Sequence, residues 1–453
     1  MELKLPLARV SYDLMGPTVA HFDLNRLPCR HSEGLLSKVA IGVKVAIGVM
    51  LSHMVEMDSG PAEQWCIPDY SGACLSNLLP AVIYRLANGG HRGSIPAPDR
   101  FRREVIRAGS ADPSESSWLP SELDGLDQIV VFVVDGLGSS QLEERLVDLE
   151  TLGSLKRITI DSVAPTTTAS ALTSITTGLP PSLHGLVGYR MRVGPRSVMN
   201  TLRWSTGAKK SSMDVNPYRI APVEPFFGLH PAVVTKSGLE KSEFSLAHLR
   251  SSRNSSWRTQ SGIGSWIKEL LSQGEKFIYA YYEGIDSTAH EFGLGDRYLE
   301  ELIYLDFMIK RITEALPKGA ALLVTADHGQ VEVLDEPLII PDGVQSKISF
   351  QSGEGRFRWL HLRSGSLEEA TKELEEAFSG VSMVLTRQQV IDQEILGPKM
   401  SLEVSRRLGD VALIATAPVS FFDPDDTGPF KLVCRHGGLS SQEVKVPLLF
   451  AIG

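Results

Sequence analysis

Four segments of the sequence place an oxygen or imidazole ligand at or near the end of an apolar run. The segments read IVVFVVDG, FIYAYYEGIDSTAH, ALLVTADHG and LVCRHGG. Together they supply three carboxylates and three imidazoles, namely Asp135, Asp286, His290, Asp327, His328 and His436. Six ligands of this kind, combined with a nucleophile, are what a two-metal site for phosphoryl transfer needs.

Taken singly, these residues carry unequal information. Asp135 after its apolar run is explained equally well as the cap of a following helix. Asp286 and His290 are four residues apart, which places them on one face of a helix, although this spacing is common by chance. The adjacent pair Asp327 and His328 is more informative, because buried charge without a partner is costly. The chemistry is indicated by the ordered set.

The segment APTTTASALTSITTG offers a nucleophile at the start of an expected helix. A hydroxyl there lies beside exposed backbone N–H groups and the positive end of the helix dipole, which together hold a phosphate group. A free hydroxyl is a poor nucleophile at neutral pH, and coordination to a metal ion would activate it. Thr168 is the favoured candidate, and Thr166 and Thr167 compete with it.

The totals for the chain exclude several classes of protein. Its 453 residues allow one large α/β domain with inserts or several smaller domains. The formal charge of −9 argues against a nucleic-acid polymer as partner, since such partners require basic surfaces. A small phosphorylated substrate stays compatible with it, because metal ions supply local positive charge. The four cysteines form neither a CxxC pair nor a disulfide framework, and Cys434 near His436 is not favoured as a ligand.

No segment reaches the roughly 18 continuous apolar residues that a membrane span requires. The nearest is residues 39 to 55, which Lys44 interrupts and which begins too late for an ordinary signal peptide. We therefore expect no membrane association and a cytoplasmic location.

The ligands are positioned by alternating strands and helices. Strands are expected over residues 129–134, 276–285, 321–326 and 446–452, and an amphipathic helix over residues 297–316. Such alternation predicts an α/β fold of three layers, with a mostly parallel central sheet covered by helices on both faces. Ligands in these sheets bind beyond the carboxyl ends of the strands. Asp135, Asp286 and Asp327 all follow strands in this way.

The domain organisation is expected to be simple. Residues 1–67 form an N-terminal segment of unknown role, and residues 68–453 form the catalytic domain. Two stretches interrupt the strand–helix pattern and are expected to be inserts, at about residues 195–265 and 341–407. Inserts near strand ends commonly shape access to a site.

These motifs, in order, resemble those of the type I phosphodiesterase/nucleotide pyrophosphatase family of the alkaline phosphatase superfamily. The segments that carry the resemblance are VVDGLG, APTTTASALTSITTGLPPSLHGLVGY, YYEGIDSTAH, LLVTADHG and CRHGGLSSQEVKVPLL. It extends over roughly residues 68 to 453 and implies an alkaline-phosphatase-like fold. The implied activity is metal-dependent hydrolysis of phosphodiester or pyrophosphate bonds in a small substrate such as a nucleotide.

The resemblance also implies a role for each matched residue. The family's nucleophilic threonine aligns with Thr168, and two divalent ions, Zn²⁺ or else Mn²⁺, are implied. One ion would be held by Asp135, Asp327 and His328 beside Thr168, and the other by Asp286, His290 and His436. The family usually has an asparagine after the HG of the threonine segment, where this chain has Tyr189 followed by Arg190. These two residues are the candidate substrate contacts, and His184 is interpreted as structural.

Alternative functions make different demands on the residues. A phosphomonoesterase on the same site would need more positive groups, and Arg190, Arg192, Arg356 and Arg358 are available in the sequence. For a diester, Tyr189, Trp204 or Trp359 offers an aromatic surface. A sulfatase lacks its cysteine nucleophile here, and a cofactor-independent phosphoglycerate mutase would use serine. A binding protein that had lost catalysis would be expected to lack a ligand, and none is lacking.

Overall fold

The computed structural model describes residues 65–88, 97–206, 215–334, 336–426 and 431–453. The chain divides into two compact units, Met1–Ala62 and Glu63–Gly453, and the described residues belong to the second. The apolar segment at residues 39–55 and nearly all of the predicted N-terminal segment lie outside these ranges. None of the helices within the described ranges combines the length and the hydropathy that crossing a membrane requires.

A seven-stranded sheet forms the centre of the larger unit, in the order β2-β15-β8-β1-β7-β5-β6. β15 runs antiparallel to both of its neighbours, whereas β8, β1, β7, β5 and β6 are mutually parallel. The strand bounds are β1 Gln128–Val134, β2 Lys156–Asp161, β5 Ala232–Lys236, β6 Arg253–Trp257, β7 Phe277–Tyr282, β8 Ala320–Thr325 and β15 Lys445–Ile452. The prediction of a mostly parallel central sheet is therefore confirmed.

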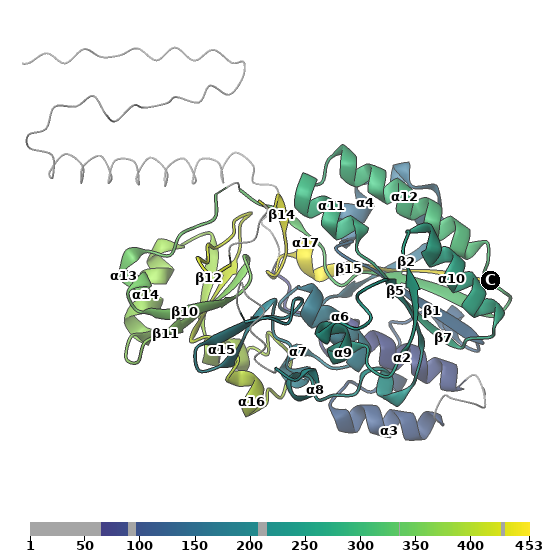
Figure 1. Ribbon diagram of the computed structural model, residues 1–453, viewed down its shortest axis with the longest axis horizontal. Coiled ribbons are helices and arrows are strands. Elements are labelled where there is room, and N and C mark those ends of the chain that lie inside the picture. The colour runs from purple at the N-terminus through teal and green to yellow at the C-terminus, as the bar shows by residue number, and fades with distance from the viewer. Residues whose placement is uncertain (1–64, 89–96, 207–214, 335, 427–430) are drawn as a thin grey trace, which may run out of the picture. The chain divides into compact units, whose positions relative to one another are not determined.

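Helices cover both faces of this sheet and complete three layers (Figure 1). One face carries α10 (Ser261–Ser272), α11 (Gly284–Phe292) and α12 (Asp296–Thr313). The other carries α2 (Leu75–Asn88), α3 (Pro98–Ala108) and α6 (Thr168–Thr177). The other α-helices of the described residues are α4 Ser139–Glu143, α5 Glu150–Ser154, α7 Pro181–His184, α8 Pro217–Ile220, α9 Glu243–His248, α13 Asp342–Gln345, α14 Leu367–Ala377, α15 Arg387–Asp392, α16 Leu402–Ser405 and α17 Ser441–Val444.

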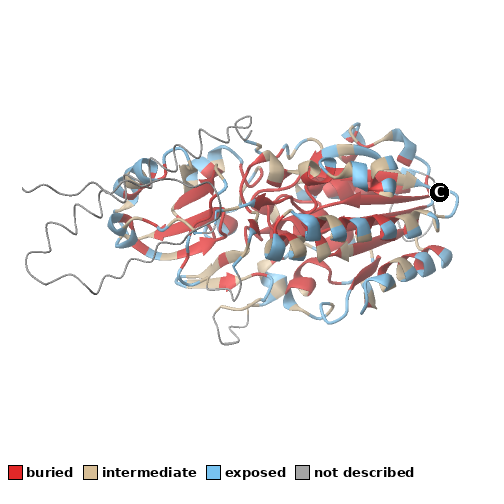
Figure 2. Ribbon diagram, turned by 90° about the horizontal axis from the view of Figure 1, so that it is seen from above, coloured by how far each residue is buried: buried red, intermediate tan, exposed pale blue. Residues whose placement is uncertain are grey.

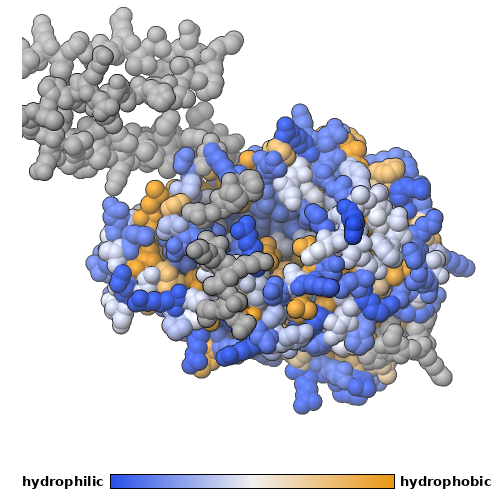
Figure 3. Space-filling view, in the orientation of Figure 1, coloured by the Kyte–Doolittle hydropathy of each residue, from blue (hydrophilic) through white to orange (hydrophobic). Residues whose placement is uncertain are grey.

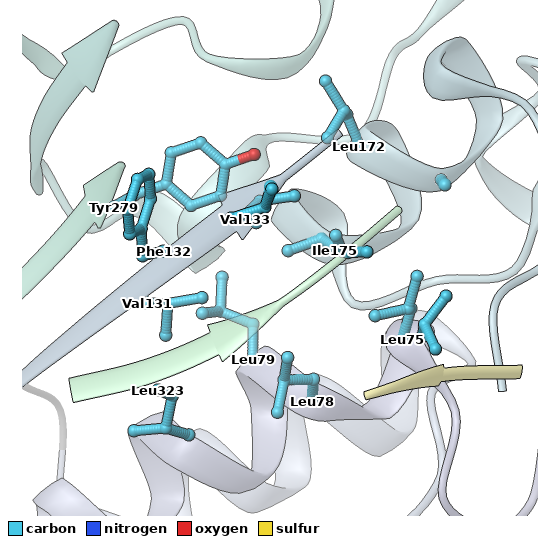
Figure 4. Packing of buried hydrophobic residues seen from close by; sticks show 14 of the residues in the cluster. Leu75, Leu78, Leu79, Val131, Phe132, Val133, Leu172, Ile175, Tyr279 and Leu323 are labelled. Atoms are coloured by element: carbon cyan, nitrogen blue, oxygen red, sulfur yellow. The ribbon is translucent and has the colours of Figure 1, made fainter. Parts of the chain in front are cut away.

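β1 is buried along its whole length, as its six consecutive apolar residues predict. In Figure 4 the side chains of Leu78 and Leu79 from α2 lie on one face of the sheet with Ile175 from α6. The apolar face of α2 and the buried helix α6 thus pack together on the strands that lead to the predicted site. Buried residues follow the central strands in Figure 2, while the surface of Figure 3 is mostly hydrophilic with smaller hydrophobic groups.

A second, antiparallel sheet of six strands has the order β12-β13-β11-β10-β3-β4. Its bounds are β3 Arg190–Gly194, β4 Ser197–Asn200, β10 Ile348–Gly353, β11 Phe357–Leu362, β12 Ser382–Thr386 and β13 Val411–Ala415. A small two-stranded sheet pairs β9 (Val331–Glu332) with β14 (Cys434–Arg435). Residues 341–407 thus supply three strands of the six-stranded sheet together with α14.

The stretch at residues 195–265 is more than an insert. It begins with β4 in the six-stranded sheet, but it also supplies β5 and β6, which extend the edge of the main sheet beyond β7. Its polar residues obscure these strands, because β6 (RNSSW) is an exposed edge strand with only Trp257 buried. Edge strands do not need the apolar runs that mark central strands.

Candidate metal centre

The six predicted ligands lie beyond the carboxyl ends of neighbouring strands. Asp135 directly follows β1, and Asp327 and His328 follow β8, which pairs with β1. Asp286 and His290 lie on α11, which begins directly after β7 on the other side of β1. His436 follows β14, where the main chain of Gly437 bridges to Thr166. The parallel register of β7, β1 and β8 therefore brings five of the six residues to one edge, and the β14 segment adds His436.

The first group consists of Asp135, Asp327 and His328, all of which are buried. His328 Nε2 lies 3.4 Å from Asp135 Oδ1 and 3.5 Å from Asp327 Oδ2. Neither of these carboxylate oxygens has a hydrogen-bond partner, although both are inaccessible to solvent. The other oxygen of Asp135 accepts a hydrogen bond from Tyr281, and that of Asp327 accepts from the N–H groups of Gly136 and His328.

The second group consists of Asp286, His290 and His436. His290 Nε2 lies 3.3 Å from Asp286 Oδ1, and His436 Nε2 lies 3.9 Å from the same oxygen. Gln330 donates a hydrogen bond of 2.9 Å to this oxygen and holds the carboxylate in place. Asp286 and His290 are brought together because they are four residues apart in α11.

The three imidazoles are oriented in the same manner. Their Nδ1 atoms bind main-chain carbonyl oxygens, at 3.1 Å for His328 to Gly329, 2.7 Å for His290 to Cys434 and 2.8 Å for His436 to Thr166. A carbonyl oxygen only accepts, so Nδ1 carries the proton and Nε2 presents a lone pair. Metal-binding histidines are usually fixed by such a hydrogen bond from the second nitrogen.

The two groups are direct neighbours. The rings of His328 and His436 stack with centroids 3.6 Å apart and planes 14° from parallel, and those of His290 and His436 are 5.2 Å apart. The structure thus brings all six predicted ligands into one continuous cluster. The geometry of the two groups is compatible with two metal ions, and the binding of these ions stays a prediction.

Buried carboxylates raise the energy of this cluster when no cation is present. Burial, followed by the charges of Asp327 and Asp286, raises the pKa of Asp135 well above its usual value. Burial likewise raises the pKa of Asp327. Burial and the neighbouring His328 and His290 lower the pKa of His436, which keeps its imidazole neutral and available as a ligand. The orphaned carboxylate oxygens and neutral Nε2 atoms fit a hard or borderline divalent cation in each group.

Thr168 is the first residue of α6 and borders the first group. Its hydroxyl oxygen lies 3.2 Å from His328 Nε2, and the side chain is 8% exposed. Thr166, by contrast, is fully buried; its hydroxyl donates to the carbonyl of Gly438 and accepts from the N–H of Gly437. The hydroxyl of Thr167 lies on the side of Glu354. Among the three competitors, Thr168 is the one whose hydroxyl contacts a predicted metal ligand.

The structure places the predicted substrate contacts in the six-stranded sheet. Arg190 begins β3 and forms an ion pair with Asp423, which also binds Arg358 at 2.9 Å. Arg356 is fully buried and makes a two-pronged ion pair with Glu443. Three of the four arginines considered for a monoester are therefore already paired inside the protein.

The aromatic candidates differ in their exposure. Trp359 is buried within β11, and the indole of Trp204 donates to the carbonyl of Val215. Tyr189 is partly exposed, and burial raises the pKa of its phenol. Tyr189 therefore stays a candidate for a substrate surface, whereas Trp359 does not. His184 is fully buried and binds Ser174 at 2.9 Å, in agreement with a structural role.

Two neighbours of the site were not predicted from the sequence. Tyr281, near the end of β7, donates to Asp135, and Glu354 enters from the turn between β10 and β11. Glu354 is 5% exposed and its Oε1 has no hydrogen-bond partner. Tyr281 opens the segment YYEGIDSTAH but is none of the ligand types that the sequence analysis considered, and Glu354 belongs to no motif.

Comparisons with known proteins agree with this architecture. Residues 129–438 match the model of the family "Type I phosphodiesterase / nucleotide pyrophosphatase". No curated protein matches the chain. Among solved structures, murine ectonucleotide pyrophosphatase/phosphodiesterase 5 is 15% identical, with a TM-score of 0.54 over 71% of this chain and 87% of that one.

A second similar structure is phosphonoacetate hydrolase from Sinorhizobium meliloti 1021, which is 16% identical. Its TM-score is 0.55 over 72% of this chain and 90% of that chain. These likenesses confirm the alkaline-phosphatase-like fold. Because the family model spans more than half of the residues, including four of the five motifs in full and the start of the fifth, this hydrolase chain belongs to the type I phosphodiesterase/nucleotide pyrophosphatase family.

Proposed function

We propose that the protein hydrolyses phosphodiester or pyrophosphate bonds of a small substrate through a covalent phosphothreonine intermediate on Thr168. The observation that carries the proposal is the position of the Thr168 hydroxyl at the N-terminus of α6, 3.2 Å from His328 and beside the six clustered ligands. An inactive threonine-to-alanine variant of the murine relative has been solved with AMP, which supports a nucleotide as one substrate to test.

The reaction proceeds by two displacements at phosphorus. In the first, Thr168 Oγ1 bonds to phosphorus and its proton passes to solvent, while the bond to the leaving oxygen breaks and that oxygen takes up a proton from solvent. In the second, a water oxygen bonds to phosphorus and gives a proton to solvent, the bond to Thr168 Oγ1 breaks, and the threonine oxygen is protonated again. The backbone N–H groups at the start of α6 orient the non-bridging oxygens.

Two divalent ions would be held by the groups Asp135, Asp327, His328 and Asp286, His290, His436. When bound, such ions supply Lewis-acid stabilisation of the attacking and departing oxygens. Imidazole and carboxylate ligands suit Zn²⁺, and Mn²⁺ is the second choice. The protein's own contribution is the fixed direction of each Nε2 atom and the placement of Thr168 between helix and ligands.

The ion pairs in the six-stranded sheet favour the diester over the monoester. A monoester carries up to two charges on its phosphoryl group and rewards a free arginine fork. Arg190, Arg356 and Arg358 are each engaged with a carboxylate of the protein. A diester needs fewer positive groups and gains from a surface such as that of Tyr189.

The test compares bis(p-nitrophenyl) phosphate with p-nitrophenyl phosphate, using protein treated with chelator and then given Zn²⁺ or Mn²⁺. We expect turnover of the diester only after metal is added, and a phosphorylated Thr168 peptide after acid quenching. A kcat/KM for the monoester about a hundredfold above that for the diester, or roughly 2.7 kcal/mol, would reject the diester assignment. Turnover without a phosphorylated threonine would reject the covalent route.

A further inference from the structure

Arg435 lies in β14, one residue before the predicted metal ligand His436. Its side chain is partly exposed and extends along the turn between β10 and β11. A methyl group added to Gly355 in that turn would lie 2.8 Å from the guanidinium nitrogen Nη1. The guanidinium therefore packs directly against the turn between β10 and β11, and its charge acts on the neighbouring ligand His436.

Two glycines allow this close contact. Gly355 leaves room for Arg435, and in the reverse direction Gly437 leaves room for Glu354. Gly437 has φ of +119°, and a methyl group there would lie 2.6 Å from Glu354 Cγ. The turn and the His436 segment thus pack closely against each other, and Arg435 lies in the contact between them.

The charge of Arg435 is not matched locally. Among the described residues it forms no hydrogen bond and no ion pair, and Asp426 acts on it only at longer range. Its basic neighbours are neutralised, since Arg190 and Arg358 share Asp423 and Arg356 binds Glu443. A partly desolvated guanidinium without a partner is costly unless a ligand supplies the anion.

We propose that Arg435 binds a second anionic group of the substrate, a carboxylate or a phosphate, separated by a few atoms from the phosphoryl group that Thr168 attacks. The inference rests on the proposed function and adds a specificity-determining residue to it. A guanidinium binds either anion through two parallel hydrogen bonds, so both sources of negative charge share one chemistry. A substrate with a single anionic centre would leave Arg435 unpaired.

The experiment measures inhibition of diester hydrolysis by three phosphonates at fixed free Zn²⁺. Propylphosphonate has one anionic centre, 3-phosphonopropionate adds a carboxylate, and propane-1,3-diphosphonate adds a second phosphonate. For the wild type we expect one of the two longer anions to bind at least about tenfold more tightly than propylphosphonate. Which of them binds more tightly identifies the anion that the subsite prefers.

Arg435→Gln should abolish this preference, and Arg192→Gln is the matched control that should keep it. Arg192 lies in β3 of the six-stranded sheet, where its guanidinium donates to the carbonyl of Gly194 and lies over the ring of Phe350. A purely structural role of Arg435 would weaken all three inhibitors alike and leave their ratios unchanged. Equal inhibition of the wild type by all three, or an unchanged preference in Arg435→Gln, overturns the subsite.

The substrate of the assay separates this inference from the proposed function. Bis(p-nitrophenyl) phosphate has one anionic centre, so its turnover tests the phosphodiesterase activity without Arg435. Should the wild type fail to hydrolyse it, the proposed function is rejected. Calorimetric titration of the Zn²⁺-loaded protein with the same three phosphonates then decides on the subsite by itself.

Discussion

The three imidazoles of the ligand cluster all direct Nε2 towards the cluster, because Nδ1 of each donates a hydrogen bond to a main-chain carbonyl. The carbonyls belong to Gly329, Cys434 and Thr166, which lie in three different segments. Ligand direction is therefore set by the backbone of the strand ends. Thr166 has a double task, since its carbonyl orients His436 and its hydroxyl binds Gly437 and Gly438.

Replacing Thr168 by alanine should remove activity while leaving the metal content unchanged. The variant deletes the proposed nucleophile but none of the six carboxylate and imidazole ligands, and kcat/KM should fall by about 10³-fold or more. Diester turnover and elemental analysis of the same samples provide the measurement. Thr167→Ala is the control and should keep most activity. Equal loss in both variants would move the nucleophile to Thr167.

Glu354 should make stability depend on pH in the chelator-treated protein. Burial is the main cause that raises its pKa from 4.5 to about 8, so the folded state disfavours the carboxylate. The unfolded chain loses this proton near pH 4.5, and stability is therefore lost as pH rises from there to about 8. The magnitude is a few kcal/mol, at roughly 1.4 kcal/mol per pKa unit.

Thermal unfolding of Glu354→Gln tests this directly, because glutamine keeps the shape and has no proton to lose. The wild type and the variant should unfold at similar temperatures at pH 5, and the variant should be the more stable at pH 9. A constant difference between the two proteins across this range would show that Glu354 does not titrate in the folded state.

At the scale of elements, the sequence predicts which ligands lie at the ends of strands. Asp135, Asp286 and Asp327 follow apolar runs, and parallel strands deliver such residues to one edge, so their proximity followed from the pattern. The pairing of Arg356 with Glu443 and of Arg190 with Asp423 could not be predicted, since each partner lies in a distant segment without periodicity. The sequence therefore suggested that these arginines are free to bind substrate, whereas in the fold they form ion pairs with the protein's own carboxylates.

Edge strands are also difficult to predict from the sequence pattern. The apolar residues of central β1 predict a strand, whereas the polar residues of β6 indicate only part of an insert. Glu354 could not be predicted for a related reason, because nothing in its local sequence indicates that a turn of the second sheet reaches Thr167, the neighbour of the proposed nucleophile. The places of β6 and Glu354 in the fold depend on long-range packing, which the periodicity of the sequence does not predict.

The contact between the turn and the His436 segment should be sensitive to a single methyl group. Gly437→Ala would bring Cβ to 2.6 Å from Glu354 Cγ and also strain a residue with φ of +119°. His436 should then shift, and the metal content should fall from two ions per chain towards one. Elemental analysis after dialysis at limiting Zn²⁺ measures this.

Gly238→Ala is the matched control for the strain that alanine causes at a glycine with positive φ. Its φ is +97° and nothing lies within 4 Å of the added methyl group. It should lower stability by about 1 kcal/mol and leave both metals bound. Loss of metal in both variants would show that general destabilisation, rather than the position of His436, causes the effect.

At the scale of the whole molecule, the ligand cluster lowers the stability of the folded protein when no cation is bound. Asp135 and Asp327 are buried beyond the carboxyl ends of the central strands β1 and β8, each with an unpartnered oxygen, and Asp286 adds a third carboxylate nearby. The surrounding strands and helices supply the stability that holds these charges together. Activity and stability of the metal-free protein are thus expected to conflict at these positions.

Asp135→Asn makes that conflict measurable. In chelator the variant should unfold at a higher temperature than the wild type, because it removes one of the two buried carboxylates that repel each other and the half-buried Asp286, and its amide oxygen still accepts from Tyr281. With Zn²⁺ at a hundred times its dissociation constant, the wild type should gain about 2.7 kcal/mol for each site filled. The variant has lost a ligand of the first group and should gain less, so the order of the two unfolding temperatures reverses on addition of metal. A variant less stable than the wild type in chelator would mean that the buried carboxyl group of Asp135 does not destabilise the metal-free protein, and the repulsion argument would be wrong.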